Sequence, residues 1–212
     1  MSDIASNRVL SETLWPAEGA GLWAKRAILV VAGVLALAIA AKIKVPLWPS
    51  PVPITLGSFA VLTIGAAYGP RLGLATILAY MAVGAVGFDV FASSTAEKNG
   101  LAYMMGGTGG YLIGYVLATL ALGWAARRGL DRSVSGMSLA MLIGTALVYI
   151  PGLLWLQHLV ASGLFDSDTF SSTWSQTLAW GFTPFLVGDL VKLALAAMVV
   201  PALWKLIGAA RS

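Results

Sequence analysis

The stretch FTPFLVGDLVKLALAAMVVPALW, residues 182–204, decides the class of this protein. It is long and apolar enough to cross a bilayer as a helix, yet it holds two opposite charges, Asp189 and Lys192, and no others. Because charged side chains cost about 2.5 to 3.5 kcal/mol each at the centre of an inserted helix, they are kept where something pairs with them or requires them. Residues three apart share one helical face. The pair is therefore either an internal salt bridge that fixes helix packing or a polar contact point for a ligand.

The composition of the whole chain is that of an integral membrane protein. Of its 212 residues, 58% are hydrophobic and 10% are charged, against about 25% charged residues in soluble domains. Spans of about 20 residues leave room for about six helices and for no sizeable soluble domain. The chain has no cysteine and one histidine, His158, which excludes disulfides, a catalytic thiol and a multi-histidine metal site. We predict an all-α integral membrane protein without a metal site.

Six apolar segments follow one another along the chain and predict a six-helix transmembrane bundle. They cover residues 27–41, 54–68, 72–88, 109–126, 137–158 and 182–207. Residues 1–26 are mixed in polarity and are predicted to form a polar N-terminal segment, with the transmembrane domain over 27–208. Only Gly69, Pro70 and Arg71 separate the second segment from the third, which predicts a tight hairpin between neighbouring antiparallel helices.

The basic residues predict the orientation in the membrane, since cytoplasmic loops carry an excess of lysine and arginine. With both ends inside, three basic residues lie in outer loops and nine lie in inner ones: Arg8, Lys25, Arg26, Arg71, Arg127, Arg128, Arg132, Lys205 and Arg211. We therefore expect a multi-pass membrane protein with both termini in the cytoplasm. Asp189 then lies in the outer half of the last helix.

Two proline- and glycine-rich stretches lie on the predicted outer face. In KVPLWPSPVPITL, residues 44–56, the prolines stiffen the backbone and Trp48 offers a flat apolar surface, which favours a preformed wall. In GGTGGY, residues 106–111, the missing side chains would let backbone N–H groups approach a ligand at a helix N-terminus. The second stretch would serve equally well as a flexible connector or for close helix packing.

Two further patterns each have two interpretations. Tyr149 and Trp155 flank Gly152 along one helical stripe; they would line a pocket, although aromatic stripes in membranes more often pack or anchor at the interface. The first predicted helix carries a ladder of small residues on one face, at Ala32, Ala36 and Ala40. Such ladders allow close helix contact, either inside the bundle or with a partner subunit.

Taken together, these features resemble the BioY family, the biotin-binding S components of energy-coupling factor (ECF) transporters. The resemblance covers residues 27–204 and rests on the order and spacing of several short motifs in six spans. The residues on which it rests are PVPITL at 51–56, YGP at 68–70, Tyr80, residues 84–87, VFA at 90–92, TGGY at 108–111 with Gly114 and Tyr115, the stripe Tyr149, Gly152, Trp155 and Leu156, and Gly188 and Asp189 with Lys192.

The resemblance implies a high-affinity biotin-binding subunit of S-component fold that is open to the outside and is not an enzyme. It implies uptake energised by partners, namely a transmembrane coupling subunit and two ABC-type ATPase subunits. Those partners alone would use ATP, and the chain lacks the G-x-x-x-x-G-K-[ST] loop that binds nucleotide phosphates. Biotin is implied as the transported substrate, without any cofactor.

The resemblance also implies roles for individual residues. Asp189 and Lys192 would contact the ureido ring of biotin. The rest of the pocket would be lined by Trp48, Thr108, Gly109, Tyr111, Tyr149 and Trp155. The face of Ala32, Ala36 and Ala40 would dock the coupling subunit.

The chain departs from the family pattern at four places. Gly57 and Gly107 replace a common glutamine and a common proline, Asp89 replaces a proline, and SSTAE at 93–97 replaces a more glycine-rich turn. In relatives a polar residue of that turn can hold the valerate tail, so Ser93 is a candidate here, with Ser94 and Asn99 as alternatives.

Two other function classes are alternatives to a biotin-binding subunit. An ion-coupled secondary transporter of a small vitamin-like solute would use Asp189 as a protonatable carrier and Lys192 as its counter-ion, within paired repeats; the six segments do not fall into two similar halves. An intramembrane enzyme would need an activated nucleophile or several metal-binding carboxylates. Only one carboxylate lies in the predicted spans.

Overall fold

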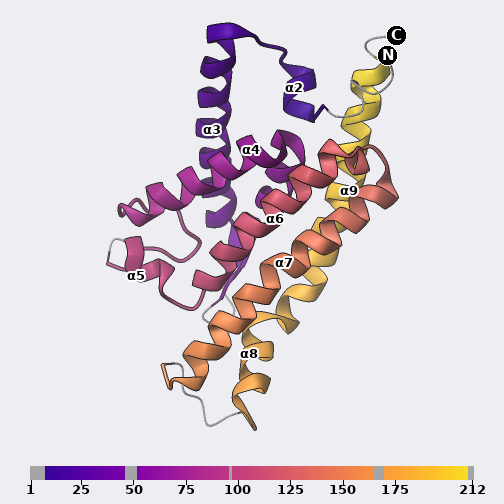
Figure 1. Ribbon diagram of the computed structural model, residues 1–212. Helices are drawn as coiled ribbons and strands as arrows, with labels where there is room; N and C mark the ends of the chain where they lie inside the picture. Colours follow the sequence, from indigo (N-terminus) through magenta and orange to yellow (C-terminus); the bar gives the residue numbers. More distant parts are fainter. Residues whose placement is uncertain (1–7, 46–51, 96, 165–169, 210–212) are drawn as a thin grey trace.

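The computed structural model describes residues 8–45, 52–95, 97–164 and 170–209 and is almost entirely helical (Figure 1). Within these ranges, five helical stretches are long and apolar enough to cross a membrane. They are α3 (Gly19–Lys42), α4 (Gly57–Ala85), α6 (Gly109–Arg127), α7 (Val134–Ala161), and the stretch of α8 (Thr173–Gly181), η2 (Thr183–Phe185) and α9 (Leu186–Ala209). The short elements are α2 (Leu10–Leu14), α5 (Gly100–Met104), η1 (Leu130–Arg132) and the antiparallel strands β1 (Lys44–Val45) and β2 (Ile54–Thr55).

The second and third predicted segments both lie in α4, which is folded at Gly69. Gly69 has φ +76° and ψ 176°, a conformation outside the helical range, and Pro70 follows it. Beyond the bend the two halves touch, because a Cβ at Gly73 would lie 3.5 Å from the Cα of Gly65; residues eight apart in a straight helix are about 12 Å apart. The six predicted segments thus become five long helical stretches, one of them bent back on itself.

Helix α6 lies at the centre of the bundle, where glycines bring it close to both neighbours (Figure 1). A Cβ at Gly123 would lie 2.6 Å from the Cα of Pro70, at the bend of α4. On the α7 side, a Cβ at Gly114 would lie 2.7 Å from the Cα of Val148. Small residues let membrane helices approach to backbone contact, so α6 fixes α4 and α7 on either side of itself.

The turn between α6 and α7 follows ordinary capping rules. Gly129 adopts φ +79° just after α6, the left-handed conformation that commonly ends helices. The Oγ of Ser133 accepts a hydrogen bond from the backbone N–H of Gly136 at 3.1 Å and so starts α7. The turn, α2 and the C-terminal part of α9 lie at one end of the molecule, while α5 and α8 lie at the other (Figure 1).

The N-terminal boundary predicted near residue 27 lies inside a helix, since α3 begins at Gly19. Upstream of it, Val9 and Leu10 are fully buried in the main hydrophobic core. Glu12 forms an ion pair with Arg127 at 2.5 Å, which ties α2 to the end of α6. The described part of the N-terminal segment therefore packs on the bundle.

Helix α3 packs mainly against α4 through Gly33, Leu37 and Ala41, which are buried. Of the alanine ladder, Ala32 and Ala36 are exposed and Ala40 is half-buried. Packing inside the bundle is therefore wrong as an explanation for Ala32 and Ala36. Ala32 and Ala36 lie on the side of α3 that points away from the bundle.

Candidate functional site

A cavity lies between α4, α6, α7 and α9, toward the end of the bundle that carries α5 and α8. Its lining is mostly apolar, with a few polar groups from different helices: Thr55, Ser58, Thr108, Tyr111, Tyr115, Thr145, Tyr149, Asp189 and Lys192. An apolar cavity with few convergent polar groups is typical of a small-molecule site.

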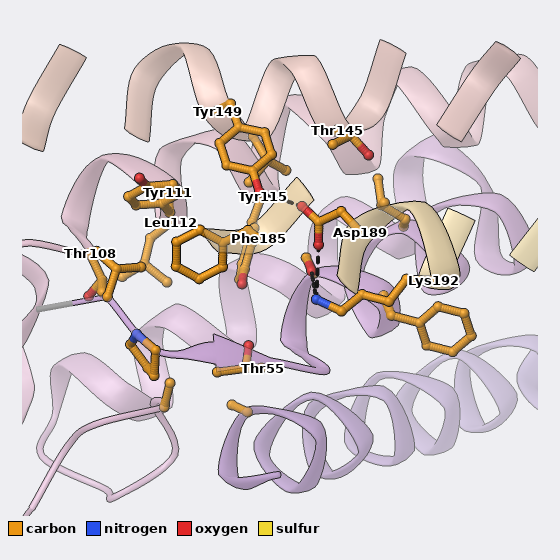
Figure 2. Close-up of a pocket in the computed structure, with 18 of the residues that line it drawn as sticks. Thr55, Thr108, Tyr111, Leu112, Tyr115, Thr145, Tyr149, Phe185, Asp189 and Lys192 are labelled. Carbon is orange, nitrogen blue, oxygen red and sulfur yellow. Dashed lines mark hydrogen bonds and ion pairs between the residues drawn. The ribbon is translucent and has the colours of Figure 1, made fainter. Parts of the chain in front are cut away.

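The polar wall of this cavity is built on the ion pair of α9 (Figure 2). Lys192 Nζ lies 3.0 Å from Asp189 Oδ1, and the two side chains are 12% and 16% exposed. The second oxygen, Asp189 Oδ2, accepts a hydrogen bond from the hydroxyl of Tyr149 on α7. Lys192 Nζ also donates to Ser58 Oγ on α4, at 3.3 Å. The predicted i to i+3 pair therefore forms, and it connects three helices.

The start of α9 brings Asp189 to this place. Thr183, Pro184 and Phe185 form the short turn η2, and α9 follows directly with Asp189 in its first turn. A carboxylate in the first turn interacts favourably with the positive end of the helix dipole. Phe185 is buried and lines the cavity beside the pair.

An aromatic cluster forms another part of the wall. The ring of Phe91 stacks on Tyr103 with centroids 4.9 Å apart and meets Tyr80 edge-on at 5.4 Å. Tyr80 also donates a hydrogen bond from its hydroxyl to the carbonyl of Val90, at 3.0 Å. Gly84 leaves room for this packing, since a Cβ there would overlap the Phe91 ring. The cluster holds the start of the α4–α5 loop against α4, next to the cavity.

Five of the predicted site residues line this cavity: Asp189, Lys192, Tyr111, Tyr149 and Thr108. Tyr111 is fixed there by its hydroxyl, which donates to the carbonyl of Gly181 at 2.9 Å. Its ring meets that of Tyr149 edge-on, with centroids 6.3 Å apart.

Of the other four predicted site residues, Trp155, Gly109 and Ser93 lie outside the lining of the cavity. Trp155 donates its Nε1–H to the carbonyl of Gly106 at 2.9 Å and packs against Gly109, so both hold the glycine-rich turn in place. The backbone N–H of Ser93 donates to the Tyr103 hydroxyl at 3.3 Å, and its neighbour Ala92 lines the cavity instead. Trp48 lies outside the described residues, so the structure does not place it.

Some lining residues were not predicted from the sequence. Thr145 precedes Tyr149 by four residues on the same face of α7, a spacing that would have found it. Ser58, Thr55 and Tyr115 lie in the cavity only because α4, β2 and α6 meet there. Thr55 and Tyr115 belong to motifs that carry the family resemblance but were given no role in the site, and no local pattern marks Ser58.

A second charged group lies where α3 meets the α4–α5 loop, next in sequence to the lining residue Ala41. Lys42 Nζ lies 2.5 Å from Asp89 Oδ1 and 3.3 Å from Ser94 Oγ. Hydrogen bonds from Lys42 and Ser94 hold the pKa of Asp89 below its ordinary value. Two of the four departures from the family pattern, Asp89 and the turn at 93–97, thus meet at Lys42. Over the described part of the chain, no three carboxylate or histidine side chains are grouped to hold a metal ion.

The fold matches a solved structure. The S-component for biotin from an ECF-type ABC transporter superposes with a TM-score of 0.71, covering 89% of this chain and 95% of that chain. The sequence identity is 22%, so this similarity concerns the fold. The arrangement of the helices is that of an ECF S component.

The sequence is also similar to curated proteins. The probable biotin transporter BioY of Pyrococcus horikoshii is 34% identical over 180 residues, which cover 85% of this chain and 96% of that protein. The biotin transporter BioY of Thermotoga maritima is 30% identical over 180 residues, with coverages of 84% and 96%. The BioY family matches residues 10–209. A match of this extent, over a chain with the S-component fold, means that this membrane protein belongs to the BioY family.

Proposed function

We propose that this protein binds biotin in the cavity between α4, α6, α7 and α9 and mediates its uptake. The observation that supports this most directly is the Asp189–Lys192 pair, which a transmembrane helix holds in the lining of a mostly apolar cavity. Relatives that align with nearly their whole length to this chain are named as biotin transporters. Those relatives are transporters rather than enzymes, and the same activity is proposed here.

The chemistry of biotin fits the lining of the cavity. Its ureido ring offers two N–H donors, which a carboxylate accepts, and one carbonyl oxygen, which an ammonium group binds. Asp189 and Lys192 would supply these two partners, and charge-assisted hydrogen bonds of this kind contribute about 1.5 to 3 kcal/mol each. The fused rings of biotin would lie against the aromatic lining, including Tyr111, Tyr149 and Phe185.

Uptake would need partner subunits that hydrolyse ATP. The chain contains no nucleotide-binding loop of the Walker type, so ATP would be used by two ABC-type ATPase subunits acting through a transmembrane coupling subunit. The coupling subunit would dock on α3, where Ala32 and Ala36 are exposed. No cofactor is needed for this function, and biotin itself is the only small molecule that the proposal requires.

The proposed orientation follows the distribution of basic residues, with both termini in the cytoplasm of a bacterial cell. Biotin would then enter from outside, and the segments before Ile54 and after Phe88 would close over it. The partner module would reorient the subunit to release biotin inward. Labelling of single cysteines introduced at positions 97 and 205 tests this orientation, since an impermeant reagent should reach only the first in intact cells.

Equilibrium binding of biotin to the detergent-purified protein tests the function. Wild type is expected to bind tightly, and Asp189→Asn and Lys192→Met are each expected to lose about 2 kcal/mol of binding free energy, the contribution of one charge-assisted bond. Lys205→Met is the control, because it makes the same change on the same helix at an exposed position. A folded wild type that does not bind biotin would refute the proposal. If both variants bound as well as wild type, the pair would be a packing element only.

The second candidate function is ion-coupled transport, in which Asp189 carries the proton. The position of Asp189 in a cavity beside Lys192 is the observation that favours it. Uptake in energised vesicles separates the two functions. Dependence on the proton gradient in the absence of ATP and of partner subunits would favour ion coupling, and dependence on the partner ATPases would favour the first proposal.

A further inference from the structure

The polar wall of the cavity is a continuous chain of hydrogen bonds across three helices (Figure 2). Ser58 of α4 binds Lys192 of α9, Lys192 binds Asp189, and Asp189 binds Tyr149 of α7. All four residues line the cavity. Any ligand that contacts the ion pair therefore meets charged groups that are already held from both sides.

Lys192 and Asp189 still have hydrogen-bonding positions that a ligand can occupy. The Lys192 ammonium has three N–H donors; among the described residues, two of them are directed to Asp189 Oδ1 and Ser58 Oγ. Asp189 has about four acceptor positions and accepts from Lys192 and Tyr149. One ammonium donor and about two carboxylate acceptor positions remain. The pair can thus bind a ligand that presents an acceptor beside N–H donors, without losing a bond that it already makes.

Ser58 determines where the remaining ammonium donor points. The three N–H bonds of an ammonium group are tetrahedral, so two fixed partners define the direction of the third. A lysine side chain is long and flexible, and with Asp189 alone the ammonium would rotate about its single remaining contact. Ser58, at 3.3 Å from Lys192 Nζ on a different helix, removes that freedom.

The position of Ser58 itself is set by the tightly packed start of α4. The backbone N–H of Gly57 donates to Thr55 Oγ1 at 3.1 Å. A Cβ at Gly57 would lie 3.2 Å from the Tyr115 hydroxyl and 3.9 Å from the Cα of Ala41. The first turn of α4 therefore lies against α6 and α3, and it presents the Ser58 hydroxyl from a fixed backbone.

We propose that Ser58 is a positioning residue which aims the Lys192 ammonium at the acceptor of the ligand and so makes the site selective for a cyclic urea. In a ring that carries an N–H donor in place of the urea oxygen, this donor would face the N–H donor of Lys192. Two donors form no hydrogen bond, so the site would bind such a ring weakly. This inference rests on the proposed biotin-binding function and names a determinant of its specificity.

The test compares two ligands, biotin and iminobiotin, whose guanidinium group at pH 7 offers only N–H donors. Affinities are measured for wild type, Ser58→Ala and Ser58→Thr, and for Thr63→Val as the matched control. Thr63 lies on the same helix, and its hydroxyl donates to the backbone carbonyl of Phe59. Melting temperatures in detergent verify that each variant is folded.

We expect Ser58→Ala to bind biotin about threefold to tenfold more weakly, the range for one ordinary hydrogen bond. The ratio of biotin to iminobiotin affinity should fall with it, because a less constrained ammonium can move away from the guanidinium. Ser58→Thr, which keeps a hydroxyl, and Thr63→Val should retain the wild-type ratio. In a Lys192→Met background, Ser58→Ala should cause no further loss.

Two results would overturn the inference: an unchanged ratio of biotin to iminobiotin affinity in Ser58→Ala, which includes equal weakening of both ligands, or a full additional loss in the Lys192→Met background. Each would mean that Ser58 acts through packing or not at all. Failure of the proposed function has a different signature, since wild type itself would then not bind biotin. In that case the inference fails with it.

Discussion

Two carboxylates contact α9, one near each of its ends, and their surroundings differ. Asp189 accepts hydrogen bonds on both oxygens, from Lys192 and from Tyr149, and the lysine supplies a compensating charge. Asp131 of η1 is only 1% exposed, and its Oδ2 accepts from Trp204 Nε1 at 2.6 Å. Its Oδ1 has no partner within the described structure. Arg132, the nearest cation in sequence, lies over the Trp204 ring with its guanidinium carbon 4.7 Å from the centroid.

Burial alone does not make a carboxylate a ligand site. Burial raises the pKa of Asp131 to about 6, although the Trp204 hydrogen bond opposes the change. Asp131 therefore connects the α6–α7 turn to α9 through its hydrogen bond with Trp204. Its burial disfavours the charged form. Asp189 has a cation, a hydroxyl donor and open cavity space beside it. These three features together permit it to hold a polar ligand.

The largest effect is expected when the cation of the Asp189–Lys192 pair is removed. Lys192→Met should reduce the free energy of unfolding by about 3 kcal/mol, because breaking a buried pair leaves one charge uncompensated. Denaturant titration in detergent measures this loss. The double variant Asp189→Asn/Lys192→Met should regain most of the stability but not the binding of biotin. If it stayed as unstable as the single variant, charge compensation would not be the cause.

Removal of the Tyr149 hydroxyl should have the next largest effect on biotin binding. Tyr149→Phe keeps the ring and its edge-on contact with Phe182, whose centroid lies 5.1 Å away, but removes the hydrogen bond to Asp189. The hydrogen bond is present with and without ligand, so its loss lowers biotin affinity only because the carboxylate is less well oriented. Affinity should fall by about threefold to tenfold, which is about 1 kcal/mol. Isothermal titration would measure it. Unaltered affinity would show that Lys192 alone orients the carboxylate.

The carboxylate at the other end of α9 should respond to pH instead of to ligand. The pKa of Asp131 is raised in the fold to about 6, while an unfolded aspartate has about 3.9. Ionisation therefore costs stability, which should be greatest below about pH 4, decrease as the pH rises to about 6, and stay constant above it. The difference between these two pKa values corresponds to a change of at most about 3 kcal/mol.

Asp131→Asn can still accept from Trp204 but cannot ionise, so this component of the pH dependence should vanish. Melting temperatures of the variant and the wild type between pH 4 and pH 7.5 measure the difference. Parallel curves for the two proteins would contradict the assignment of a raised pKa to Asp131.

The smallest effect concerns a third, exposed carboxylate. In the Lys42–Asp89 pair the side chains are 34% and 54% exposed, and exposed pairs contribute about 0 to 1 kcal/mol. Asp89→Asn should lower stability by less than about 1 kcal/mol, and added salt should reduce the difference further. The same variant should release biotin faster if this pair holds the loop closed. A stability loss as large as that of Lys192→Met would mean that exposure does not separate the two pairs.

The sequence predicted the helical elements well because each apolar segment is long and nearly free of charge. It also predicted that Asp189 and Lys192 pair, since a three-residue spacing needs no knowledge of other helices. The start of α3 was placed too late because Lys25 and Arg26 resemble the end of an apolar segment. In the structure Lys25 is buried, and its ammonium donates to the backbone carbonyl of Trp15.

The site was only partly predictable, for reasons of tertiary packing. Tyr149 and Trp155 share a stripe on α7, but only Tyr149 faces the cavity, since the Trp155 indole reaches the Gly106 carbonyl instead. No sequence pattern predicted Ser58, because its partner Lys192 lies 134 residues away in the chain. Spacing along one helix cannot tell which neighbouring helix will lie opposite.

Position 84 has no room for any side chain, because the Phe91 ring packs directly on Gly84. Residue 84 is buried in α4 and offers no group to a ligand, so an alanine there would look harmless by composition or charge. Its methyl group would occupy the place of the Phe91 ring. Tyr80 and Tyr103 occupy two other sides of that ring, and the cavity lies on a third. A single added carbon atom would therefore push an aromatic ring toward the space meant for the substrate, and the protein would be blocked by its own side chain.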